Sequence, residues 1–70
     1  MNYTAVFERG VDGWWVASCL EMPAANTQGA SIEEARENLK DAIQLLLKVR
    51  REDAERELEG RDILRETLVL

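Results

Sequence analysis

Apolar and polar residues alternate in the first third of the chain. Residues 3–8 (Tyr-Thr-Ala-Val-Phe-Glu) and residues 14–20 (Trp-Trp-Val-Ala-Ser-Cys-Leu) flank the segment Gly-Val-Asp-Gly at positions 10–13. A period of two predicts β-strands, and two glycines with an aspartate supply the positive φ angles of a tight turn. The pattern therefore predicts a β-hairpin. Residues 26–29 are expected to add a short third strand after Pro23, which lacks an amide donor and marks a strand end.

From Ser31 onward the spacing of apolar residues changes to steps of three and four, which predicts a helix with one apolar stripe. Ser31 followed by Glu34 matches a capping box, and Gly60 is placed to end the helix. The stripe consists of Ile32, Ala35, Leu39, Ala42, Ile43, Leu46 and Leu47. Residues 48–59 either continue this helix or form a second short one after a break near Val49. The absence of Gly and Pro in this stretch favours the continuous helix.

Residues 63–70 alternate again and predict a last strand. The expected order is β-β-β-α-β, an α+β fold in one domain over residues 1–70, with one long helix on one face of a small sheet. Trp14 and Trp15 are adjacent, so they point to opposite faces of that sheet. An apolar patch on the uncovered face would mark an interface. We expect interface residues at Trp14, Trp15, Thr67 and Val69.

A chain of 70 residues supports only a marginal core. The sequence has one cysteine, Cys19, and no histidine, so neither an internal disulfide nor a structural zinc site is expected. Self-association is the remaining means of stabilisation. We therefore expect a homo-dimer or tetramer with no cofactor and no metal.

The net charge is −5, from 9 Lys and Arg against 14 Asp and Glu. This balance argues against nucleic acid as a direct partner and favours encounter with a basic protein. No leader-like segment or apolar stretch long enough to span a bilayer is evident. A cytoplasmic location without membrane contact is the default expectation.

Several short motifs occur here in a characteristic order. They are Asp12-Gly13, Trp15-Val16-Ala17, Glu21-Met22-Pro23, Gln28-Gly29, Ser31-Ile32-Glu33-Glu34-Ala35 and Glu37-Asn38-Leu39-Lys40-Asp41-Ala42-Ile43. This ordered set, over about residues 3–47, resembles the HicB-like antitoxin family. The resemblance implies a shortened ribonuclease-H-like fold without catalysis, which oligomerises and neutralises a small basic HicA-type ribonuclease toxin.

The chain departs from the family pattern at three places. Because it ends at Leu70, we expect it to lack the C-terminal DNA-binding segment that many members carry. Trp14 replaces a glycine that usually follows the turn, and Ala24-Ala25-Asn26 replaces a glycine-cysteine after Pro23. The alternative function is a stand-alone oligomeric scaffold or regulator with no toxin partner.

Nuclease chemistry of the ribonuclease-H type needs carboxylates that converge on metal ions. The carboxylates near the predicted sheet, Glu8, Asp12, Glu21 and Glu66, are not forced together by their positions, so we expect no enzyme. Cys19 is expected to be a buried small apolar residue. The charged stretch over residues 48–61 is either a docking surface for a toxin or a solvated helix face, and both interpretations remain open.

Overall fold

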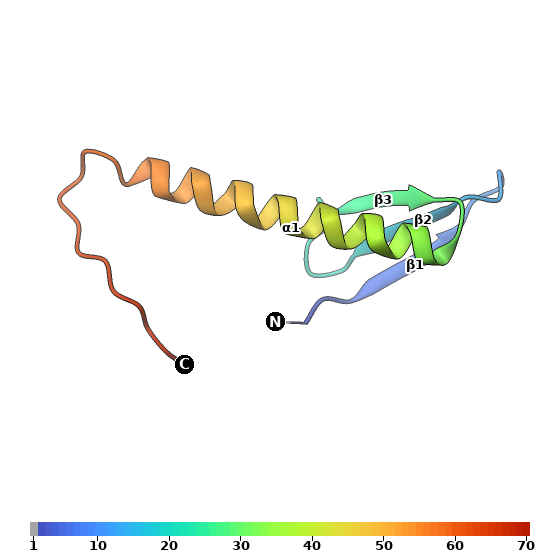
Figure 1. Ribbon diagram of the computed structural model, residues 1–70, viewed down its shortest axis with the longest axis horizontal. Coiled ribbons are helices and arrows are strands. Elements are labelled where there is room, and N and C mark those ends of the chain that lie inside the picture. The colour runs from blue at the N-terminus through green and yellow to red at the C-terminus, as the bar shows by residue number, and fades with distance from the viewer. Residues whose placement is uncertain (1) are drawn as a thin grey trace.

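The computed structural model describes residues 2–70 and consists of a three-stranded sheet followed by one long helix (Figure 1). The strands are β1 (Ala5–Arg9), β2 (Trp15–Cys19) and β3 (Asn26–Gly29), in the spatial order β1-β2-β3. Both strand pairs are antiparallel. The predicted hairpin and third strand are confirmed, and Gly13 adopts the positive φ of 86° that its turn requires.

Helix α1 (Ile32–Glu57) is continuous, which confirms the interpretation of residues 48–59 as part of the first helix. The Ser31 side chain caps it and accepts a hydrogen bond from the Glu34 amide at 3.1 Å. The Glu34 carboxylate reaches back to the Ala30 amide at 3.4 Å. After the helix ends, Gly60 turns the chain with a φ of 74°.

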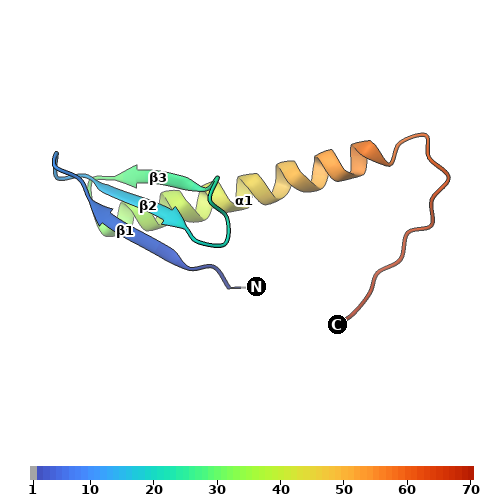
Figure 2. The same cartoon turned by 180° about the vertical axis from the view of Figure 1, so that it is seen from behind.

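The helix lies across one face of the sheet, as Figures 1 and 2 show from opposite sides. The core between these two layers is built from small and unbranched side chains, with only Leu39 from the larger aliphatic residues. Its buried members are Ala17, Cys19, Met22, Ala25, Ala35 and Leu39. Tyr3, Phe7, Trp15, Ala42, Ile43 and Leu46 pack around them. The predicted burial of Cys19 is confirmed.

The molecule is elongated, with principal extents of 53 × 26 × 15 Å. A helix of 26 residues is about 39 Å long, whereas a five-residue strand spans about 17 Å. The second half of α1 therefore projects beyond the sheet (Figure 1). Leu45 and Val49 on this half are exposed, because the described chain brings no sheet to cover them.

The final strand predicted over residues 63–70 is not formed. Within residues 2–70 the sheet contains β1, β2 and β3 alone, and residues 63–70 form an irregular segment after the helix. We call this segment the tail. It leaves the far end of α1 and no strand lies beside it, so its backbone groups lack the partners that a strand needs. The confirmed fold is α+β in the order β-β-β-α.

Candidate protein-binding face

Alternation along the two longer strands decides which side chains face the helix. The ladder between β1 and β2 pairs Val6 with Ser18 and Glu8 with Val16. It continues past the strand ends, because the Leu20 amide donates to the Thr4 carbonyl at 3.0 Å. Ala17 and Cys19 point into the core, so the residues between and beside them point away from the helix.

The outward side chains form an apolar patch, which we call the open face. Its members are Val6, Trp14, Val16 and Leu20, which are 40%, 42%, 45% and 64% exposed. They come from the two strands of the hairpin and from the positions directly next to β2. Helix α1 covers the other side of the sheet (Figure 2), so this apolar patch has no cover within the described chain.

The two tryptophans lie on opposite faces, as their adjacency predicts. Trp14 belongs to the open face, whereas Trp15 is half-buried and packs against the core. The Arg9 guanidinium lies 5.7 Å from the centre of the Trp15 ring, within the range of a cation–π contact. Trp15 is therefore mainly part of the folded core, and Trp14 is the tryptophan that the open face offers to a partner.

Two carboxylates lie on or beside the open face, and a third lies at one end of β2. Glu8 lies on it directly opposite Val16, and Asp12 accepts a hydrogen bond from the Trp14 amide at 3.1 Å. Glu21 follows Leu20 at the other end of β2. The open face is thus an apolar centre with a negative border.

Glu21 is held in place by hydrogen bonds from Thr4. The Thr4 amide donates to one carboxylate oxygen of Glu21, and the Thr4 hydroxyl donates to the other at 2.7 Å. The Cys19 thiol donates a weaker bond at 3.5 Å. The hydrogen bond from the Thr4 backbone is the largest cause that lowers the pKa of Glu21 to about 2. These bonds tie the end of β2 to the start of β1 and keep the carboxylate ionised.

Glu21 should make the protein sensitive to acid. Its pKa is depressed in the folded state, so its contribution is present above about pH 4.5 and is lost as the pH falls towards 2. Replacing it by glutamine (Glu21→Gln) should lower stability at pH 7 and flatten the loss of stability between pH 4.5 and 2. Urea unfolding at several pH values measures both effects. The matched change Glu8→Gln removes a carboxylate without these hydrogen bonds from Thr4 and should lower the stability at pH 7 by less than Glu21→Gln does.

The tail residues predicted for the interface lie elsewhere. Thr67 and Val69 are exposed, and the tail extends from the end of the molecule opposite the hairpin turn (Figures 1 and 2). The structure therefore does not bring them together with Trp14 and Trp15. The predicted set missed Val6, Val16 and Leu20, although the period of two through residues 14–20 places Val16 and Leu20 on the same side as Trp14.

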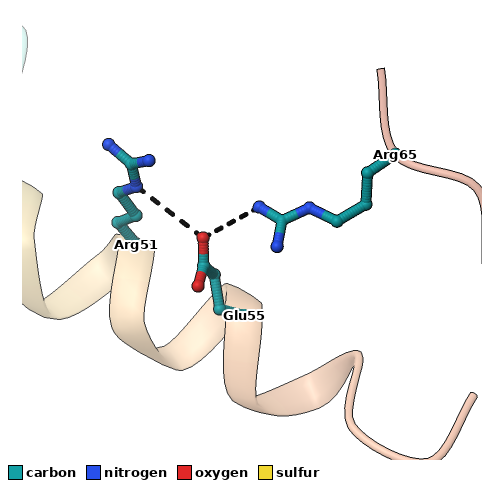
Figure 3. A network of polar contacts seen from close by, with 3 residues as sticks. All are labelled: Arg51, Glu55 and Arg65. Carbon is teal, nitrogen blue, oxygen red and sulfur yellow. Dashed lines mark hydrogen bonds and ion pairs between the residues drawn. The ribbon is translucent and has the colours of Figure 1, made fainter. Parts of the chain in front are cut away.

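The far half of α1 carries exposed ion pairs. Arg51 and Glu55 lie 3.8 Å apart, and Arg56 and Asp53 lie 3.5 Å apart. Exposed pairs of this kind each contribute at most about 1 kcal/mol. Arg65 of the tail joins them through a 2.9 Å contact to Glu55 (Figure 3). Both interpretations of residues 48–61 remain compatible with this exposed surface.

Two further features bear on the kind of site. Across residues 2–70, no three Cys, Asp or Glu side chains gather where they could hold a metal ion. In the same range, α1 is not apolar enough over a sufficient length to cross a membrane.

The fold and the open face define a small α+β protein with one helix on a three-stranded sheet and an acidic, apolar face. The chain belongs to the UPF0150 family. It is 43% identical over 67 residues to UPF0150 protein ssl0738 of Synechocystis sp., covering 96% of this chain and 92% of that protein. A UPF0150 protein of Archaeoglobus fulgidus is 37% identical over 57 residues, covering 79% of this chain and 83% of that protein. No family model matches the chain, and no solved structure matches it.

Proposed function

We propose that this chain is a non-enzymatic protein-binding module whose open face binds a small basic protein. The single observation that carries the proposal is the composition of that face, in which Trp14 and three aliphatic side chains are exposed inside a border of carboxylates. Protein interfaces commonly have an apolar centre and a polar rim. Tryptophan is among the residues that most often dominate binding energy.

The charge of the chain supports a basic partner. Glu8 and Asp12 flank the apolar centre, and the whole chain carries a net charge of −5. Complementary charge speeds encounter and disfavours acidic competitors. The ionised Glu21 at the far end of β2 extends the same field along the sheet. A basic protein surface is therefore a better complement than a nucleic acid, whose phosphates the border would repel.

The resemblance to HicB-like antitoxins makes the proposed partner more specific. In that family the module covers a small basic HicA-type ribonuclease and does no chemistry itself. We therefore propose that this chain is an antitoxin of that type. The alternative is a stand-alone oligomeric scaffold derived from the same family.

The partner can be sought in the native host. The chain is purified at its endogenous level and analysed by native mass spectrometry, and the neighbouring reading frame is examined for a small basic protein. A complex with that protein, whose ribonuclease activity is suppressed by one equivalent of the chain, would establish the antitoxin function. A basic partner without ribonuclease activity would support the module and contradict the antitoxin. A homo-oligomer with nothing else bound would favour the scaffold.

A pair of charge reversals tests where the partner binds. Glu8→Lys places a cation on the open face, and we expect it to weaken the complex by about tenfold or more, because attraction becomes repulsion next to a buried contact. Asp41→Lys makes the same change in net charge on exposed helix surface and should leave affinity within about twofold. Titration of the co-purified basic protein by calorimetry provides both numbers. Equal effects of the two variants would mean that only the net charge matters and that the open face is not the site.

A further inference from the structure

Strand β1 has an unpaired outer edge. The Leu20 amide donates to the Thr4 carbonyl, and the Gly10 amide donates to the Trp14 carbonyl. Hydrogen-bonded positions alternate along an antiparallel pair, so Val6 and Glu8 are the residues of β1 whose backbone groups bond to β2. The backbone groups of Ala5 and Phe7 therefore point away from the sheet. In the described chain no other backbone hydrogen bond uses them. An open edge of this kind is a template for another strand.

The opposite edge of the sheet is partly covered. On β3, the carbonyl of Gln28 accepts a hydrogen bond from the side-chain amide of Asn38 on α1 at 2.9 Å. One of the outward groups of β3 is thus occupied by the helix. Of the two edges, β1 is the more available for strand addition.

A groove of about 600 Å³ runs between the β1 edge and α1. We call it the edge groove. Its apolar wall comprises Tyr3, Ala5, Leu39, Ile43 and Leu47, and the cations Arg36 and Lys40 also line it. A strand that added to β1 would place every second side chain into this groove.

The tail has the composition that this groove requires. Leu64, Leu68 and Leu70 share one face of the alternating pattern, with Glu66 between them. These leucines are 91%, 74% and 117% exposed in the single chain. Three leucines match the apolar wall of the groove, and Glu66 matches its cations.

The tail of the same chain reaches only part of its own β1 edge. The Arg65 guanidinium lies at the level of Glu55, which it contacts at 2.9 Å (Figure 3). Five residues follow it and span at most about 18 Å. At about 1.5 Å per helical residue, this length ends near the level of Ile43. The strand extends further, because Phe7 of β1 lies 5.6 Å from the Arg36 guanidinium.

The tail can reach the full edge groove of a second copy. If the tail extends back along α1 from the level of Glu55, its middle reaches the level of about Arg50, whereas the middle of the edge groove lies near Lys40. If two α1 helices lie antiparallel about a two-fold axis near Leu45, the level of Arg50 in one copy lies opposite the level of Lys40 in the other. The tail of each copy then lies beside the edge groove of the other copy. The same axis would bring Leu45, which is exposed in the single chain, against its equivalent in the other copy.

We propose that two copies of this chain associate by reciprocal strand addition, with the tail of each copy pairing antiparallel to the β1 edge of the other and filling its edge groove with leucines. The strand predicted over residues 63–70 then forms only between copies. This inference goes beyond the proposed function, because it uses the β1 edge and the edge groove and leaves the open face free.

The test uses three variants of the full chain. Leu68→Asp changes the tail, Leu47→Asp changes the partly exposed wall of the edge groove, and Val11→Asp makes the same kind of change at the fully exposed hairpin tip. Sedimentation velocity at protein concentrations of roughly 1 to 100 µM, where a dimer of micromolar affinity dissociates measurably, reports the dissociation constant. We expect a dimer for the unaltered chain and for Val11→Asp. Both other variants should show at least a tenfold rise in the dissociation constant.

A mixture of the Leu68→Asp and Leu47→Asp variants distinguishes reciprocal strand addition from other modes of self-association. A Leu68→Asp copy keeps its groove and a Leu47→Asp copy keeps its tail, so their mixture restores one of the two exchanged contacts. Native mass spectrometry should show the mixed dimer in excess over either homodimer. A monomeric unaltered chain, a Leu68→Asp variant that dimerises normally, or a mixture without enrichment of the mixed dimer would each overturn the proposal. None of these outcomes depends on whether a basic protein binds the open face.

Discussion

Replacing Gly29 by alanine (Gly29→Ala) should destabilise the protein by about 2 to 3 kcal/mol, because the added methyl group meets the helix backbone. A Cβ at this position would lie 2.5 Å from the Ala35 amide nitrogen and 3.0 Å from the Ala35 Cα. These are backbone atoms of the first helical turn, which the Ser31 cap fixes. Either β3 or the start of α1 must move. The midpoint and slope of urea unfolding measure the loss.

The matched control is Gly10→Ala in the hairpin turn. A Cβ there would lie 2.9 Å from a carboxylate oxygen of Asp12, and that side chain can rotate away at the loss of its exposed hydrogen bond from the Trp14 amide. The expected loss is below about 1 kcal/mol, since the substitution also removes freedom from the unfolded chain. Equal losses for Gly10→Ala and Gly29→Ala would show that the contact with the helix backbone is not what requires glycine at Gly29.

Truncation of Leu39 should have the largest effect on stability of any single change. Leu39 is 3% exposed and is the largest aliphatic side chain among the buried core residues. Leu39→Ala should cost about 2 to 5 kcal/mol through lost burial and a residual cavity. A single-core domain of this size has only about 3 to 5 kcal/mol to lose. We expect a chain that is largely unfolded at 25 °C, as measured by circular dichroism.

The control for this change is Val11→Ala. Val11 is fully exposed at the hairpin tip, so its truncation removes no buried apolar surface and leaves no cavity. Its unfolding midpoint should stay within error of the unaltered chain. A Leu39→Ala variant with a cooperative transition at the original midpoint would contradict the assignment of Leu39 to the core.

The two proposed contacts use different residues. The open face contains Trp14 and Val16 from β2 and its flank, whereas the edge groove is formed by β1 and α1. A dimer made by tail exchange would therefore keep two open faces. We expect such a dimer to bind two basic partners, and native mass spectrometry of the complex would show a two-to-two assembly.

Local patterns in the sequence were sufficient for the three strands and the helix. The turn glycines, the alternation through residues 14–20 and the steps of three and four after Ser31 each depend on neighbours within a few residues. The Ser31 cap and the uninterrupted helix to Glu57 also follow from local chemistry. The opposite orientations of Trp14 and Trp15 follow from their adjacency alone.

The fate of residues 63–70 could not be decided in that way. Their alternation describes a strand correctly as a pattern, but a strand exists only where another strand pairs with it. The helix carries the tail beyond the sheet, where Arg65 contacts Glu55. The length of α1 relative to the strands therefore decided the outcome.

The site shows the same division between local and distant effects. Sequence alone placed one of the two adjacent tryptophans on an uncovered sheet face and determined the acidic charge of the chain, and the tertiary structure decided that this tryptophan is Trp14. Only the tertiary structure joined Glu21 to Thr4, which lies 17 positions earlier, and placed the edge groove between β1 and α1. Contacts between distant residues depend on how the layers pack, and no spacing along the chain specifies that packing.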